Sequence, residues 1–136
     1  MKKTVLRIVA LALLTVMTCT LFVACAPNAD PDKAEKSLEK KDYEVKHADN
    51  KLEAAFMGGW YDGCEEVILA YNDESKEVVY IWYFEDKASA DDAWDDIEEY
   101  AEELNEEAKE EGNKIVCKKS GKMIYIGTKK AIRDAA

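Results

Sequence analysis

The chain has 136 residues, of which 29 are Asp or Glu and 19 are Lys or Arg, so its formal net charge at pH 7 is −10. This balance argues against nucleic acid as a partner, because few cations are available to neutralise phosphates. It also argues against a domain that lies flat on an anionic membrane, since like charges repel at short range.

The first residues predict an export signal. Lys2, Lys3 and Arg7 form a positive start, and an uncharged run from 8 to 24 leads to Cys25. This order is typical of a secretory leader that ends at a cysteine.

The end of this leader, from Phe22 to Cys25 (FVAC), resembles the lipobox of bacterial lipoproteins. The resemblance covers the leader alone. It implies cleavage of a signal peptide, 1–24, and attachment of a diacylglycerol with fatty chains such as palmitate to the sulfur of Cys25. Two acyl chains hold a protein stably on a membrane. We therefore expect a lipidated tether over 25–33, and anchorage at the extracytoplasmic face of the cell membrane.

Two alternatives for the leader stay open. Ordinary secretion would use the A-x-A-like site formed by Ala24 and Ala26. An uncleaved membrane helix would use the apolar run of 17 residues from 8 to 24, which is at the short edge for a span of about 20.

The remaining chain is large enough for one domain, expected over 34–136. Removing the first 24 of 136 residues leaves 112, which can bury one core but not two. The leader takes three of the 19 basic residues and none of the 29 acidic ones, so the mature chain carries 16 basic and 29 acidic side chains, a net charge of −13.

The first part of the domain predicts two short helices and a strand between them. Residues 33–41 can form a helix, and 42–48 alternate as a half-buried strand with Tyr43 and Val45 on its inner side. Residues 50–57 predict a second helix that ends at a glycine pair. The residues of this helix that are expected to face inward are Leu52, Ala55 and Phe56.

A hairpin is predicted next. The stretches 64–71 and 77–84 are rich in β-branched and aromatic residues, and a cluster of turn residues, 72–75, separates them. Because 77–84 is apolar on both faces, we expect a central strand or a strand whose second face meets another element.

The longest predicted helix spans 89–111, with Ser89 and Asp92 resembling a capping box and Gly112 as its stop. Its apolar stripe must face the core. The stripe consists of Ala90, Trp94, Ile97, Ala101, Leu104 and Ala108.

A second hairpin, 114–118 with 123–127, and a short frayed helix at 129–136 complete the predicted elements. Together they favour an α+β fold, with an antiparallel or mixed sheet of about five strands packed against helices on one face. The element order matches a ferredoxin-like βαββαβ arrangement with an added strand. The alternative is two helix-plus-hairpin units, 50–84 and 89–127.

Two surface features are candidates for binding. The many carboxylates of 91–111 form either a solvated face or a surface for cations or a basic partner, and no D-x-D-x-D-G calcium loop is present. The aromatic residues suggest a ligand surface, although many of these rings are needed for the core. The candidate binding residues are Trp60, Tyr61, Asp62 and Trp82.

The cysteines and the single histidine give weaker signals. Cys64 and Cys117 favour one disulfide in an exported domain, and two free thiols are the alternative. Neither has a Cys or His partner at metal-ligand spacing, so no metal or cofactor is expected. His47 is expected at the surface, because no nucleophile motif accompanies it.

The leading hypothesis is a non-enzymatic, lipid-anchored binding or accessory module of the cell envelope. Its expected partner is an envelope protein or peptide. The alternatives are an inhibitor that presents the aromatic loop at Trp60 and Tyr61, and an envelope enzyme with carboxylate catalysis.

Overall fold

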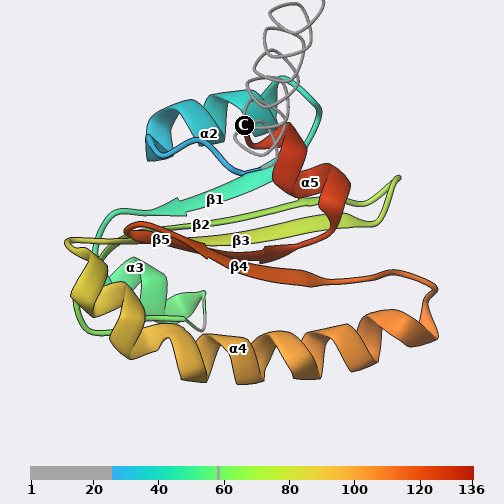
Figure 1. The fold of residues 1–136 in the computed structure, drawn as a ribbon. Coiled ribbons are helices and arrows are strands. Elements are labelled where there is room, and N and C mark those ends of the chain that lie inside the picture. The colour runs from blue at the N-terminus through green and yellow to red at the C-terminus, as the bar shows by residue number, and fades with distance from the viewer. Residues whose placement is uncertain (1–25, 58) are drawn as a thin grey trace, which may run out of the picture.

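A computed structural model describes residues 26–57 and 59–136, so the predicted leader, Cys25 and Gly58 lie outside the described residues. The described chain forms an antiparallel sheet between two layers of helices (Figure 1). The strands are β1 (Glu44–Ala48), β2 (Cys64–Asn72), β3 (Glu77–Phe84), β4 (Val116–Ser120) and β5 (Met123–Gly127). The helices are α2 (Pro31–Glu39), α3 (Lys51–Phe56), α4 (Lys87–Glu110) and α5 (Lys129–Asp134).

The strand order of this five-stranded sheet is β1-β2-β3-β5-β4, and all neighbouring strands are antiparallel. The α+β fold is therefore confirmed. The ferredoxin-like arrangement is wrong, because it requires a parallel crossover, whereas β1 lies at the sheet edge and pairs antiparallel with β2. The order fits the two helix-plus-hairpin units, which meet where β3 pairs with β5.

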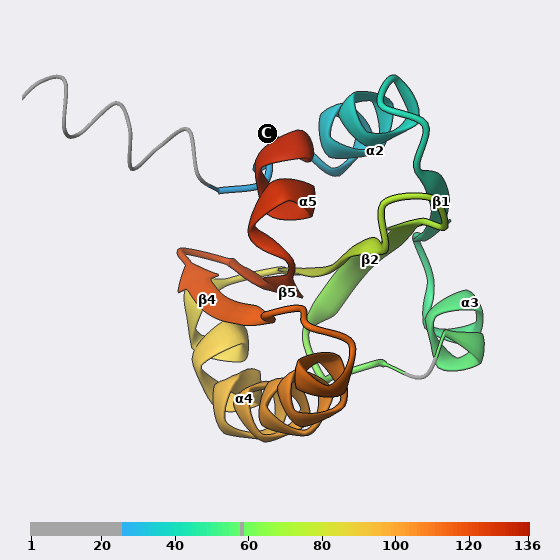
Figure 2. The same ribbon diagram turned by 90° about the vertical axis from the view of Figure 1, so that its right-hand side faces the viewer.

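Helices cover both faces of the sheet, so the prediction that they lie on one face is wrong. Helices α2 and α5 pack on one face, and α3 and α4 pack on the other (Figures 1 and 2). The physical reason is the central strand β3, which is apolar on both sides. Its residues Val79, Ile81 and Tyr83 face α2 and α5, whereas Tyr80, Trp82 and Phe84 belong to the core beneath α3 and α4.

Helix α4 begins one turn earlier than the cap at Ser89 predicts. Asp86 is the N-cap, because its carboxylate accepts a hydrogen bond from the backbone N–H of Ser89 at 2.7 Å. The buried residues of the helix are Ala90, Ala93, Ile97 and Ala101. Trp94 is half-buried at the edge of the stripe, with the Lys119 ammonium 5.4 Å from its ring centroid. The carboxylates of 91–111 are all exposed, as a solvated face requires.

The segment 26–30, which belongs to the predicted lipidated tether over 25–33, packs on the domain. Pro27 is buried, and the backbone N–H of Asn28 donates to the Ala135 carbonyl at 2.8 Å. The Tyr83 hydroxyl donates to the Asn28 carbonyl at 2.9 Å. Pro31 then starts α2, which binds this segment into the fold.

Helix α5 is packed and not frayed. Ala131 and Ile132 are buried against α2 and the sheet, and Asp134 is buried beside them. The Asp134 carboxylate accepts hydrogen bonds from the Tyr43 hydroxyl at 2.9 Å and from the Lys130 ammonium at 2.6 Å. A helix this short has little stability of its own, so tertiary contacts hold it.

Helix α3 packs through a different residue from those predicted. Leu52 is 71% exposed and Ala55 is also exposed, whereas Ala54 is fully buried. The side chain of Phe56 lies outside the described residues. The prediction fails because six residues are too few for a periodicity to define one face.

Candidate functional site

The loop between α3 and β2 is held by two aromatic rings of β3. The Tyr80 hydroxyl donates to the Met57 carbonyl at 3.0 Å, and the Trp82 Nε1–H donates to the Gly59 carbonyl at 3.1 Å. The two rings stack with their centroids 4.1 Å apart. A glycine is needed at position 59, because a Cβ there would lie 2.5 Å from the Tyr80 hydroxyl oxygen. The loop is therefore built tightly against the sheet.

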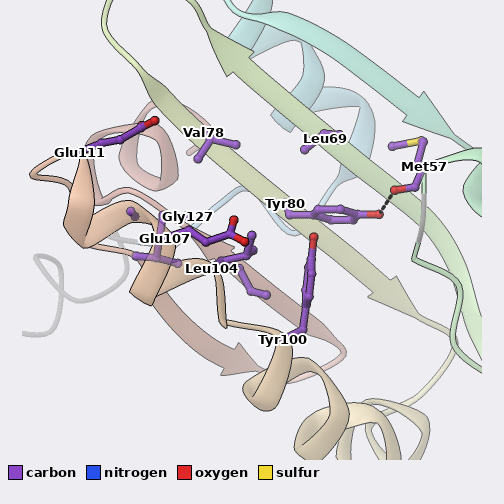
Figure 3. Close-up of a pocket in the computed structure, with 12 residues that line it drawn as sticks. Met57, Leu69, Val78, Tyr80, Tyr100, Leu104, Glu107, Glu111 and Gly127 are labelled. Atoms are coloured by element: carbon purple, nitrogen blue, oxygen red, sulfur yellow. Dashed lines mark hydrogen bonds between the residues drawn. The ribbon is translucent and has the colours of Figure 1, made fainter. Parts of the chain in front are cut away.

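A groove with a volume of about 330 Å³ opens beside this loop (Figure 3). Helix α4 packs against β3, β5 and β4, while α3 packs against β1 and β2 (Figure 2). The groove lies between α4 and Met57, the residue that follows α3. The apolar and aromatic residues that line it are Met57, Leu69, Val78, Tyr80, Tyr100, Leu104, Ala108, Ile115 and Ile126. Its volume is at the lower end of the ~300–1,000 Å³ typical of ligand sites, so it suits a few apolar side chains.

The two ends of the groove differ in chemistry. Tyr100 rises from α4 toward Tyr80, so two phenol groups lie at one end, and Glu111 lies at the other (Figure 3). Glu107 also lines the groove, and both carboxylates are exposed. Tyr100 is 38% exposed on a helix surface that is otherwise acidic. An apolar segment that carries positive charge matches this combination of walls and rim.

A second, acidic hollow of about 500 Å³ brings together three of the predicted binding residues, Trp60, Tyr61 and Asp62. Trp60 and Tyr61 are half-buried, and the Tyr61 ring meets the Trp82 ring edge-on at a centroid distance of 6.0 Å. The aromatic loop therefore packs against the domain and does not protrude. The remaining side chains around the hollow come from Glu85, Ser89, Asp92, Ala93 and Asp96.

The prediction that Trp82 belongs to a binding surface is wrong, because its side chain is fully buried. It instead supports the loop that carries Trp60 and Tyr61. Sequence reasoning missed the groove residues Leu69 and Leu104 as a binding surface. The signal that could have found this site is Tyr100, an aromatic residue that lies outside the apolar stripe of the predicted helix.

Tyr80 and Tyr61 stay protonated at neutral pH. Burial raises the pKa of Tyr80 well above its usual value, and the neighbouring phenols of Tyr100 and Tyr61 raise it further. Burial also raises the pKa of Tyr61, together with the negative charge of Asp96. Both hydroxyls therefore remain hydrogen-bond donors.

Cys64 and Cys117 are both free thiols, so the predicted disulfide is wrong. The two residues lie on β2 and β4, and β3 and β5 separate these strands in the sheet. Three strand spacings amount to about 14 Å, whereas a disulfide needs Cα atoms within about 7 Å. Burial raises the pKa of Cys64 to about 12 and that of Cys117 to about 11, so neither thiol is a ready nucleophile.

His47 is not the free surface residue that the sequence predicts. Its side chain is 13% exposed, on the side of β1 that faces α2. Its Nδ1 lies 2.6 Å from a carboxylate oxygen of Glu35, and its Nε2 lies 3.1 Å from one of Glu66. Burial by itself lowers the pKa of His47, but the hydrogen bonds and charges of Glu35 and Glu66 raise the pKa above its usual value. The alternation that places Val45 inward also places His47 inward.

Comparisons with protein families, with curated proteins and with solved structures find no match for this chain. Among residues 26–57 and 59–136, no helix combines the length and the apolar character needed to cross a membrane. The function is therefore inferred from the leader residues and from the geometry of the groove.

Proposed function

We propose that this protein is a lipid-anchored binding module of the cell envelope, held at the extracytoplasmic face of the cell membrane through Cys25. Its site is the groove between α4 and Met57, and its ligand is an apolar, positively charged peptide segment of an envelope partner. The observation that carries the proposal is an apolar groove whose exposed rim is acidic.

The packing of the groove supports a binding role. Leu69, Val78 and Ile126 present apolar surface from three neighbouring strands, and Leu104 adds to it from α4. Burying such surface against a partner contributes roughly 25 cal/mol per Å². The phenol oxygens of Tyr80 and Tyr100 supply polar groups that can orient a ligand.

The charge of α4 supports the choice of a cationic partner. Glu107 and Glu111 are both exposed and lie one helical turn apart, where like charges destabilise a helix by a few tenths of a kcal/mol. A Lys or Arg side chain placed between them would relieve this repulsion. Because these charges are exposed, they contribute mainly to association rate and partner choice, and salt weakens their effect.

The alternatives have less support. An inhibitory loop needs a protruding anchor, whereas Trp60 and Tyr61 are half-buried against the domain. Carboxylate catalysis commonly uses an acid whose pKa is raised by burial, and the carboxylates around the acidic hollow are exposed.

A peptide titration tests the groove. Fluorescence anisotropy would compare a short labelled peptide of alternating Leu and Lys with one in which Glu replaces Lys. We expect only the Lys peptide to bind, and binding to fall when Leu104→Asn or the pair Glu107→Lys and Glu111→Lys is introduced. Glu74→Lys is the matched control, because Glu74 is exposed in the turn between β2 and β3. Equal loss in the control would mean that the peptide responds only to total charge, and the proposed site would be wrong.

The partner itself can be captured at the same position. A photo-reactive phenylalanine analogue in place of Tyr100 should crosslink an envelope protein through a basic, apolar segment in intact cells. The same analogue at Leu52, which is 71% exposed on α3, is the control. Identical crosslinks from the two positions would contradict recognition by the groove.

A further inference from the structure

His47 stands at the centre of a second cluster, on the opposite face of the sheet from the groove. It comes from β1, Glu66 comes from β2, and the first two turns of α2 bring Asp32 and Glu35 above them. Asp32 and Glu35 are three residues apart, so they lie on the same side of the helix. Three separate elements therefore direct ligand-type side chains at one point.

The atoms of this cluster lie close enough to converge on a metal ion after a small movement of Asp32. One ring nitrogen of His47 and one carboxylate oxygen each from Asp32 and Glu66 all lie within 4.8 Å of one another. His47 Nε2 and Glu66 Oε1 are 3.1 Å apart. Two ligands on one tetrahedral ion, with bonds of about 2.0–2.1 Å, lie about 3.3 Å apart, so this pair needs almost no movement to share an ion.

Glu35 makes the hydrogen bond that metal-binding histidines commonly form through the ring nitrogen that does not bind the metal. Its carboxylate lies 2.6 Å from His47 Nδ1, the nitrogen opposite the one that faces Glu66. A neutral imidazole has one N–H and one free nitrogen, so donation from Nδ1 to Glu35 leaves Nε2 as a ligand. A carboxylate on the second nitrogen orients the ring and strengthens the metal bond.

We propose that Asp32, His47 and Glu66 bind a divalent transition metal ion of the zinc type, with Glu35 as the positioning residue for His47. The imidazole nitrogen favours zinc over calcium or magnesium, which prefer sites made of oxygen ligands. Three protein ligands leave a fourth position for water or for a group from a partner. The ion would join α2 to β1 and β2 at the edge of the sheet.

A cobalt titration tests this site in the full-length chain, purified in a mild detergent without metal. Cobalt(II) reports tetrahedral coordination through intense visible absorption bands. We expect one equivalent of cobalt to bind with these bands, and zinc to displace it. Zinc should also raise the melting temperature of the parent chain, because it binds only the folded state.

Matched variants separate a built site from weak binding to the acidic surface. His47→Gln and Glu66→Gln should abolish the cobalt bands, and Glu35→Gln should lower the affinity about 10–100-fold. Glu103→Gln, on the exposed face of α4, should leave binding unchanged. Far-UV circular dichroism without metal checks that each variant folds.

Equal cobalt affinity in the parent and in a folded Glu66→Gln chain would overturn the proposal. A pale octahedral spectrum in the parent would do the same, since it would indicate binding by water and scattered carboxylates. This test is independent of the peptide titration, because the groove variants lie on the other face of the sheet.

Discussion

Replacing Trp82 by Phe removes the hydrogen bond that holds the loop beside the groove. The substitution keeps a ring that can stack on Tyr80, but it deletes the Nε1–H that donates to the Gly59 carbonyl at 3.1 Å. Gly59 and Trp82 are both buried, so the carbonyl loses its donor in a place where water has little access.

The expected cost follows from two contributions. A buried acceptor left without a donor costs about 1–3 kcal/mol, and the smaller ring adds about 1 kcal/mol through lost packing, which gives about 2–4 kcal/mol. Tyr80→Phe is the matched control. It removes only the hydroxyl that donates to the half-buried Met57, so we expect about 0.5–1.5 kcal/mol.

Guanidinium unfolding of the full-length chain in mild detergent, followed by far-UV circular dichroism, measures both values. The midpoints are comparable if the slope of the transition is unchanged. A loss below about 0.5 kcal/mol for Trp82→Phe, the range of ordinary surface substitutions, would refute the assignment of this ring as a buried support for the loop.

Three further predictions concern the core, the pH dependence and the anchor. Ile97→Ala should cost about 2–5 kcal/mol in unfolding free energy, because Ile97 is fully buried. Trp94→Ala should cost less than the same change at a fully buried Trp, because Trp94 is half-buried. A larger loss for Trp94→Ala than for Ile97→Ala would contradict the assigned face of α4. Burial raises the pKa of Asp134, but its hydrogen bonds from Lys130 and Tyr43 lower the pKa more, so the net pKa lies below the ordinary value of 3.8. The stability that Asp134 contributes is therefore present above pH 3.8 and is lost as pH falls through the folded-state pKa. Asp134→Asn should lower the unfolding free energy at neutral pH and make it depend less on pH below about 5, as measured by denaturation at several pH values. Plots of unfolding free energy against pH that run parallel for the two chains would argue against this role. Cys25→Ala should move the chain out of the membrane fraction or leave it unprocessed, and unchanged fractionation and lipid labelling would contradict the proposed anchor.

The regular elements were predictable because their signals are local. Alternation marked β1, the β-branched and aromatic stretches around a turn cluster marked the hairpin of β2 and β3, and the apolar stripe marked α4, with differences of a few residues at the ends. Errors arose where one segment depends on another that is distant in the chain. Helix α5, for example, is packed because α2 and the sheet enclose it. The cap of α4 is a local error, since Asp86 and Ser89 are three residues apart and both are residue types that cap helices.

The candidate sites were predictable only in part. Trp60, Tyr61 and Asp62 do gather around one hollow, because adjacent loop residues stay close in any fold. Trp82 could not be assigned correctly without knowing that α3 and α4 cover its face of the sheet. The groove was not predicted, because its lining comes from four separate elements and from the residues between them.

The amino-acid sequence by itself determined the excess of negative charge, which follows from composition, and the strands and the long acidic helix, because these depend on neighbours a few residues apart. Tertiary structure alone decided the strand order, the covering of both sheet faces, the separation of Cys64 from Cys117 and the contacts of His47 with Glu35 and Glu66. These features depend on which strands pair and on which face each helix packs. Both are set by burying apolar surface across the whole chain, and short-range periodicity contains no information about that choice.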